Sequence, residues 1–105
     1  MDIKKELNAR LDLGLARYGH GVRVDDDTTT WGTPKNSWME MAKEELLDAI
    51  IYVVADYIRT CGDRGENDDN ELIMKYAIDL KLIKSEKHRL ILWNLKYLLA
   101  GDLLG

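Results

Sequence analysis

The chain has 105 residues, of which 46% are hydrophobic and 32% are charged, and its formal net charge is −4 at pH 7. This length supports a single domain over residues 1–105 with one modest core, and the acidic balance excludes the basic surface that non-specific nucleic-acid binding requires. A single cysteine cannot form an intrachain disulfide, and neither a signal peptide nor an apolar run long enough to cross a membrane is visible, so we expect a cytoplasmic protein.

The first predicted element is a helix over residues 2–18, where apolar side chains recur at three- and four-residue spacing. These side chains are Leu7, Leu11, Leu15 and Tyr18. Residues 19–37 follow as a long connection that holds the only proline and runs of three Asp and three Thr. A connection of this length in a compact domain is usually functional or disordered, and we expect a functional one. Trp31 predicts that it is fixed to the domain, and a short hairpin over residues 22–30 is an open alternative.

The strongest helical signal comes next. Ser37 and Glu40 form the capping-box pattern S-x-x-E, which places the start of the helix at Trp38. Gly62 is expected to end it, because glycine is the residue most often found just past a helix C-terminus. The result is a central helix that is long for a chain of this size.

Two further helices are predicted after a turn over residues 62–67. Asp68 and Glu71 resemble a second capping signal, an apolar stripe continues from there to Ile83, and Ser85 is the expected cap of the last helix. No β-rich stretch is present, so we expect an all-α, four-helix bundle-like fold with a long central acidic helix. The apolar faces exceed what one small core can bury, which predicts a homodimer or homotetramer.

The central helix carries acids on one face, while its opposite face is almost wholly apolar. These acids are Glu44, Glu45, Asp48 and Asp56, and Tyr52 lies on the same face. Mg²⁺ prefers oxygen ligands and is usually held by one or two carboxylates plus water and substrate phosphates. Glu45 and Asp48 are three residues apart and therefore neighbours on the helix surface, as a metal-binding pair requires. A solvated face paired with basic side chains is the alternative.

Residues 44–55, EELLDAIIYVVA, resemble the E-E-L-x-D-x-h-x-Y-h-h-x helix (h, apolar) of the all-α nucleoside triphosphate pyrophosphohydrolases, the MazG-like superfamily. The segment that begins with RYGHGV at residues 17–22 is similar to small phage-type members of that group. The resemblance implies an oligomeric helical protein that binds Mg²⁺ (or Mn²⁺) and cleaves an NTP or dNTP to NMP and pyrophosphate. It implies Glu45 and Asp48 as metal ligands.

The family binds metal through a second element, an E-x-x-E on a preceding helix, which this chain does not contain. The upstream acids are Glu6, Asp12, Asp25, Asp26, Asp27 and Glu40. Downstream, Glu66 and Asp69 have E-x-x-D spacing but follow a turn. The remaining ligands are therefore expected from the connection or from a second subunit, and the sequence leaves open whether the protein is an enzyme.

If hydrolysis is retained, Glu44 is the expected group that orients or deprotonates the attacking water, and Asp56 is a candidate ligand for a second ion. The candidate substrate contacts are Tyr52, Arg23, Lys35, Trp31 and Arg17. Trp31 and Trp38 can stack on a base, although both residues also suit a core. His88 is expected at the surface, and Cys61 is expected to be buried or half-buried.

Three hypotheses follow. The first is a Mg²⁺-dependent nucleotide pyrophosphohydrolase, a hydrolase of the host cytoplasm if it is phage-encoded. The second is a catalytically silent protein that binds and sequesters a nucleotide or a nucleotide signal. The third is a helical protein-interaction module whose acids meet a basic surface.

Overall fold

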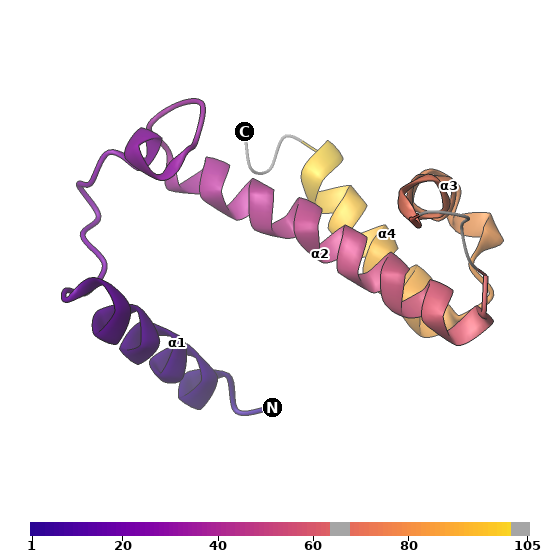
Figure 1. The fold of residues 1–105 in the computed structure, drawn as a ribbon, viewed down its shortest axis with the longest axis horizontal. Helices are drawn as coiled ribbons and strands as arrows, with labels where there is room; N and C mark the ends of the chain where they lie inside the picture. The colour runs from indigo at the N-terminus through magenta and orange to yellow at the C-terminus, as the bar shows by residue number, and fades with distance from the viewer. Residues whose placement is uncertain (64–67, 102–105) are drawn as a thin grey trace.

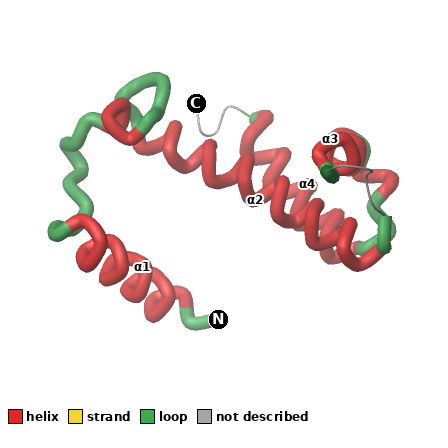
Figure 2. The backbone as a smooth tube through the Cα atoms, in the orientation of Figure 1, coloured by secondary structure: helices red, strands yellow, loops and turns green. Residues whose placement is uncertain are grey.

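A computed structural model describes residues 1–63 and 68–101. All regular elements of the described chain are helices, and it contains no strand, which confirms the all-α prediction (Figures 1 and 2). Its elements are α1 (Ile3–Tyr18), η1 (Thr28–Trp31), α2 (Trp38–Cys61), α3 (Asn70–Ile78), η2 (Leu80–Leu82) and α4 (Glu86–Ala100). The hairpin alternative for residues 22–30 is wrong, because that segment ends in the 3₁₀ turn η1.

Helix α2 begins and ends where its capping residues predict. The hydroxyl of Ser37 accepts hydrogen bonds from the backbone N–H groups of Met39 (3.2 Å) and Glu40 (3.4 Å). The carboxylate of Glu40 does not return to Ser37, as a full capping box would have it, but pairs with Lys43 at 3.2 Å. At the other end Gly62 adopts φ 78°, a left-handed conformation that costs glycine little, and donates to the carbonyl of Ile58.

The apolar stripe that starts after residue 68 is interrupted. Helix α3 ends at Ile78, and Asp79 then accepts a hydrogen bond from the N–H of Lys81, which starts η2 as a separate turn. Ile83 lies just beyond η2 and is fully buried. The residues of the stripe therefore contribute to the core from two short elements. Of the predicted turn at 62–67, residues 64–67 lie outside the described part of the chain, and so does Glu66.

The core lies between α2, α3 and α4, and α2 packs against both of the other helices. Its buried apolar residues are Val54, Tyr57, Ile58, Tyr76, Ile83 and Leu92. The rings of Tyr57 and Tyr76 meet edge to face at 5.4 Å between centroids. Full burial of an aliphatic side chain such as Leu92 contributes about 1.5–3 kcal/mol to the stability of the fold.

Hydrogen bonds reinforce this packing at the helix ends. The hydroxyl of Tyr57 accepts from the backbone N–H of Lys84 at 3.0 Å, and Lys96 on α4 donates to the carbonyl of Ala77 near the end of α3 at 2.6 Å. The hydroxyl of Tyr76 donates to the Asp63 carboxylate at 3.0 Å, which raises the pKa of Tyr76 to about 12. The bonds to Lys84 and Ala77 satisfy backbone groups between or at the ends of the helices.

Helix α1 stands outside this core. It has regular caps, with the Asp2 carboxylate accepting from the N–H of Lys5 at its start and Gly19 (φ 78°) at its end, but it buries no residue. Figure 1 shows α1 and α2 leaving the 19–37 connection as two separate arms. The described chain contains no helix that is long and apolar enough to cross a membrane.

Two expectations about individual residues are wrong. His88 is buried, with 7% of its surface exposed, because its ring packs against Tyr57 at 5.6 Å between centroids. Cys61 is exposed, since it is the last residue of α2.

Candidate functional site

The 19–37 connection is held together by a buried hydroxyl group. Thr28 is fully buried, and its hydroxyl accepts from the backbone N–H of Ser37 at 2.7 Å. The same oxygen lies 2.8 Å from the hydroxyl of Thr33 and 3.2 Å from the carbonyl of Lys35. Because buried polar groups are costly unless they are hydrogen-bonded, this cluster favours one conformation of the connection.

A second set of bonds shapes η1. The carboxylate of Asp27 accepts from the backbone N–H of Thr29 at 2.9 Å and from its hydroxyl at 2.6 Å, and these bonds lower the pKa of Asp27. Gly32, at φ 101°, ends the turn in a conformation that other residues rarely adopt. The turn places the Trp31 side chain beside the end of α1, where its ring meets that of Tyr18 edge to face at 5.5 Å.

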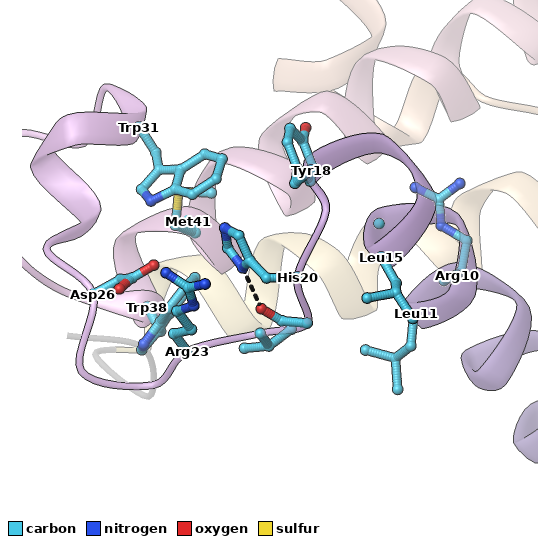
Figure 3. A pocket seen from close by; sticks show the side chains of 13 residues that line it. Arg10, Leu11, Leu15, Tyr18, His20, Arg23, Asp26, Trp31, Trp38 and Met41 are labelled. Atoms are coloured by element: carbon cyan, nitrogen blue, oxygen red, sulfur yellow. Dashed lines mark hydrogen bonds between the residues drawn. The ribbon is translucent and has the colours of Figure 1, made fainter.

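A pocket of about 260 Å³ lies where α1, the connection and α2 meet; we call it the junction pocket (Figure 3). It is lined from α1 by Arg10, Leu11, Gly14, Leu15 and Tyr18, from the connection by His20, Gly21, Val22, Arg23, Asp26 and Trp31, and from α2 by Trp38 and Met41. The indole N–H of Trp38 donates to the carbonyl of Val24 at 2.9 Å, which fixes one wall.

The chemistry of the junction pocket combines aromatic rings with guanidinium groups. Arg23 and Asp26 reach it from a single turn, which is closed by a hydrogen bond from the N–H of Asp26 to the carbonyl of Arg23 at 3.0 Å. Arg10 enters from the α1 side. Aromatic faces accept flat rings, and guanidinium groups bind phosphate or carboxylate. The pocket therefore suits a small ligand that has both a planar ring and an anionic group.

The acids Glu44, Glu45 and Asp48, which we call the acidic face, lie on the exposed surface of α2. None of the three forms an ion pair with another described residue. Met41, in the junction pocket, lies four residues before Glu45 and seven before Asp48, on the same side of the helix. At 1.5 Å per residue, these two carboxylates lie roughly 6 and 10 Å further along the helix axis.

The donor set of the acidic face fits a hard divalent cation that retains water or phosphate ligands. Glu45 and Asp48 supply two carboxylates at helical neighbour spacing, which matches the usual protein contribution to a Mg²⁺ site. Within residues 1–63 and 68–101, no cluster of three or more Asp, Glu, His or Cys side chains could hold a metal ion. Residues 1–63 and 68–101 thus supply two neighbouring carboxylates for such an ion and no larger cluster.

Asp56 has a different environment from the other acids. Its carboxylate lies 2.6 Å from Nε2 of His88, whose Nδ1 lies 2.5 Å from the hydroxyl of Ser85, the N-cap of α4. The hydrogen bond with His88 lowers the pKa of Asp56. This chain of contacts joins α2 to the start of α4, so in this structure Asp56 serves the packing of the helices.

The structure brings together only some of the predicted substrate contacts. Arg23 and Trp31 both line the junction pocket. Lys35 pairs with Glu40 at 3.5 Å, Arg17 is exposed on α1 outside the pocket, and Tyr52 is 68% exposed beyond the acidic face.

Sequence reasoning missed the contribution of α1 to the pocket. Arg10, Gly14 and Tyr18 recur every four residues, so they share one side of α1 that leads to the connection. This spacing was the only available signal, and Tyr18 was instead assigned to the apolar stripe of the helix. Met41 lies three residues after Trp38 on α2, so the two side chains are neighbours on the helix surface and both line the pocket.

Comparison with known proteins gives no match: no family model, no curated protein and no solved structure is similar to this chain. The resemblance of residues 44–55 to the MazG-like helix therefore remains a prediction from that motif.

Proposed function

We propose that this protein is a Mg²⁺-dependent nucleotide pyrophosphohydrolase of the MazG-like type, with Mn²⁺ as an alternative cation. The observation that carries the proposal is the position of the junction pocket next to the acidic face on one side of α2. A ring-binding pocket and a set of free carboxylates, about 6–10 Å apart along a helix, match the two ends of a nucleotide.

In this proposal the base lies against the indole rings of Trp31 and Trp38. The guanidinium of Arg23 binds a phosphate, and the rest of the phosphate chain extends along α2 toward Tyr52. Glu45 and Asp48 would hold the cation, which would supply neutralisation of phosphate charge and a lower pKa for a bound water. Lys35 and Arg17 are further phosphate contacts only if they move from their present positions.

The proposed reaction is an in-line displacement at the α-phosphorus. Glu44 orients the attacking water and takes its proton. The water oxygen forms a bond to phosphorus while the bond between that phosphorus and the pyrophosphate oxygen breaks, which leaves NMP and pyrophosphate. The role of Glu44 follows from its place beside both metal-binding acids on the exposed side of α2.

A second candidate is a nucleotide-binding protein without turnover. It is favoured by the finding that the described part of one chain contains no group of three or more Asp, Glu, His or Cys side chains that could hold a metal ion. In that case the junction pocket binds the ligand and the acidic face only balances its charge through a cation. The carboxylate of Asp56 contacts His88. In both cases Asp56 can bind a second ion only if that contact opens.

We further propose that the protein works as a homo-oligomer, a homodimer or a homotetramer, in the cytoplasm. Support comes from the large number of exposed apolar side chains on α1, α2 and α4. A second subunit is also a source of metal ligands that one chain lacks.

Pyrophosphate release from a panel of NTPs and dNTPs, with Mg²⁺ or Mn²⁺, tests the enzyme. We expect release by the wild type and its loss in Glu45→Gln, while the matched control Glu71→Gln, an exposed acid on α3, retains it. Absence of release in the wild type would reject hydrolysis.

Nucleotide binding is measured separately by thermal stabilisation. Arg23→Gln is expected to lose the stabilisation, whereas Arg59→Gln, at the other end of α2, keeps it. Binding without release identifies the sequestering protein. If neither nucleotide binding nor pyrophosphate release is observed, the helical interaction module is the hypothesis that remains.

A further inference from the structure

The junction pocket contains a carboxylate that no described residue pairs with. Asp26 lines the pocket and is half-buried, and its side chain forms no hydrogen bond or ion pair with another described residue. Its neighbours in the sequence differ. The Asp27 carboxylate accepts two hydrogen bonds from Thr29, and Asp25 is exposed and does not line the pocket. Of the three successive acids, Asp26 is therefore the one whose carboxylate is available to a ligand in the pocket.

The size and walls of the junction pocket suit one flat ring system. Its volume of about 260 Å³ is smaller than the roughly 300–1,000 Å³ of pockets that hold drug-sized ligands, so it accepts a base rather than a whole nucleotide. The walls are formed before a ligand enters. The ring of Trp31 meets that of Tyr18, and the indole N–H of Trp38 is bonded to the carbonyl of Val24. Aromatic walls of this kind bind planar rings by stacking.

His20 adds a second hydrogen-bond acceptor. Its Nδ1 lies 2.7 Å from the carbonyl oxygen of Gly21, and a carbonyl can only accept, so Nδ1 carries the proton. The Nε2 atom of the neutral ring is then an acceptor. It lies on the side of the ring away from Gly21, toward Trp31 (Figure 3). A base that meets both Asp26 and His20 must therefore present hydrogen-bond donors at its edge.

The pattern of donors distinguishes the common bases. A carboxylate offers two oxygens side by side, and both accept. Guanine presents two adjacent donors, N1–H and the 2-amino group. Adenine and cytosine place a ring nitrogen acceptor next to their amino group, and uracil and thymine flank their single N–H with two carbonyl oxygens. Each of these four would set an acceptor against the carboxylate, and sites that leave buried polar groups unpaired reject such ligands.

We propose that the junction pocket selects guanine nucleotides, with the Asp26 carboxylate accepting from N1–H and from the 2-amino group of the base. Arg23 enters the pocket from the same turn, which the N–H of Asp26 closes onto the Arg23 carbonyl at 3.0 Å, and it remains the phosphate contact. Asp26 is thus a specificity-determining residue. The assignment rests on the proposed function in that the ligand is a nucleotide, but it requires neither metal nor hydrolysis.

Calorimetric titration of the full chain with nucleoside monophosphates, without a divalent cation, tests this selection. We expect GMP to bind more tightly than AMP. IMP, which lacks the 2-amino group, should bind about 10- to 100-fold more weakly than GMP, because it leaves one carboxylate oxygen unpaired. Asp26→Asn replaces one accepting oxygen with a donor. Its preference should move from GMP to XMP, which carries a carbonyl oxygen in place of the 2-amino group.

Asp25→Asn is the matched control, since it removes the same charge one residue away and outside the pocket. It should retain the wild-type order of affinities, and circular dichroism of both variants shows whether the helices are kept. The proposal is overturned if the wild type does not bind GMP or binds AMP equally well. It is also overturned if Asp26→Asn keeps the wild-type order of affinities.

Hydrolysis is assayed separately, so the two proposals fail in different ways. Selective binding of GMP without pyrophosphate release from any NTP rejects the enzyme alone. Equal release of pyrophosphate from GTP, ATP, CTP and UTP, with equal affinity for their monophosphates, rejects the guanine selection alone.

Discussion

Thr28 shows how one buried hydroxyl can determine the shape of a long connection. Its side chain has no exposed surface and lies at the centre of contacts to Thr33, Lys35 and Ser37. The run of three threonines in the sequence gave no sign that the first of them differs from the others. Only the fold distinguishes Thr28, which points inward, from Thr29 and Thr30, which are exposed.

We predict that Thr28→Val loosens the connection without unfolding the core. Valine keeps the shape but leaves the N–H of Ser37 without its acceptor, which costs about 1–3 kcal/mol. Exchange of the Ser37 amide hydrogen should then accelerate by about 5- to 150-fold, provided that the connection opens locally. Thr30→Val, at an exposed position, is the control. An unchanged Ser37 exchange rate in Thr28→Val would contradict this account of the connection.

Asp56 provides a pH-dependent contribution to stability. The pKa of this carboxyl is lowered, chiefly by its hydrogen bond with His88. A group with a lowered pKa in the folded state stabilises the protein above its ordinary pKa, here 3.8, and loses this contribution as the pH falls through the folded-state value.

We therefore predict that Asp56→Asn is less stable than the wild type at pH 7 and that the difference narrows below about pH 4. Urea unfolding of both proteins at several pH values measures this difference in stability. Asp48→Asn, at an exposed acid without an ion pair in the described chain, should change stability little at any pH. A difference for Asp56→Asn that does not change between pH 7 and pH 3 would refute the linkage.

At the scale of elements, short-range chemistry predicted the helices well. Ser37, Ser85 and Gly62 mark helix ends in the sequence and in the structure, because caps depend on bonds within a few residues. The break between α3 and η2 was not predicted. An apolar stripe continues through it, and the competing hydrogen bond that the N–H of Lys81 donates to the Asp79 carboxylate is visible only once the backbone is placed.

The candidate site was predicted less completely than the helices. Arg23 and Trp31 were identified, since loop residues with these side chains are common ligand contacts. Arg10 and Tyr18 were not, because their part in the pocket depends on the angle between α1 and α2. Buried His88 was assigned to the surface for the same reason: its partners, Asp56 and Tyr57, come from a different helix.

The packing of α4 on α2 leads to a direct prediction. Leu92→Ala should lower the free energy of unfolding by about 2–5 kcal/mol, since Leu92 is fully buried and a cavity remains. Trp93→Ala, one residue further and 57% exposed, should cost clearly less in the monomer, although it loses its stacking on Tyr97. Urea unfolding of both variants measures the contrast, and equal losses would contradict the placement of the core.

At the scale of the whole molecule, the sequence indicated that the apolar surface exceeds one small core. It could not show which helix lies outside that core, because the stripes on α1 and α4 look alike in the sequence. The structure assigns the core to α2, α3 and α4 and leaves α1 without buried residues. The described residues form four α-helices, as expected, whereas bundle-like packing of all four within one chain is not shown.

If the proposed homo-oligomer forms, the stability of the protein must depend on its concentration. A tenfold increase in concentration should raise the midpoint of thermal unfolding of the wild type, because association favours the folded state by mass action. Leu7→Glu, which puts a charge among the exposed apolar side chains of α1, should show a smaller increase, and Leu13→Glu, on the other side of α1, should behave as the wild type. Differential scanning calorimetry at two concentrations provides the measurement. A concentration-independent midpoint for the wild type would contradict the prediction.

The location of the junction pocket has a thermodynamic consequence of its own. Its walls come from both arms of the molecule, so a ligand that fills it contacts α1 and α2 together and favours one angle between them. Oligomerisation that covers the exposed apolar side chains of α1 would also select an angle between α1 and α2. Two events that select a common conformation are coupled with equal strength in both directions. Occupancy of the pocket and assembly of the oligomer would then act as mutual effectors, each tightening the other where the preferred angles agree and opposing it where they differ.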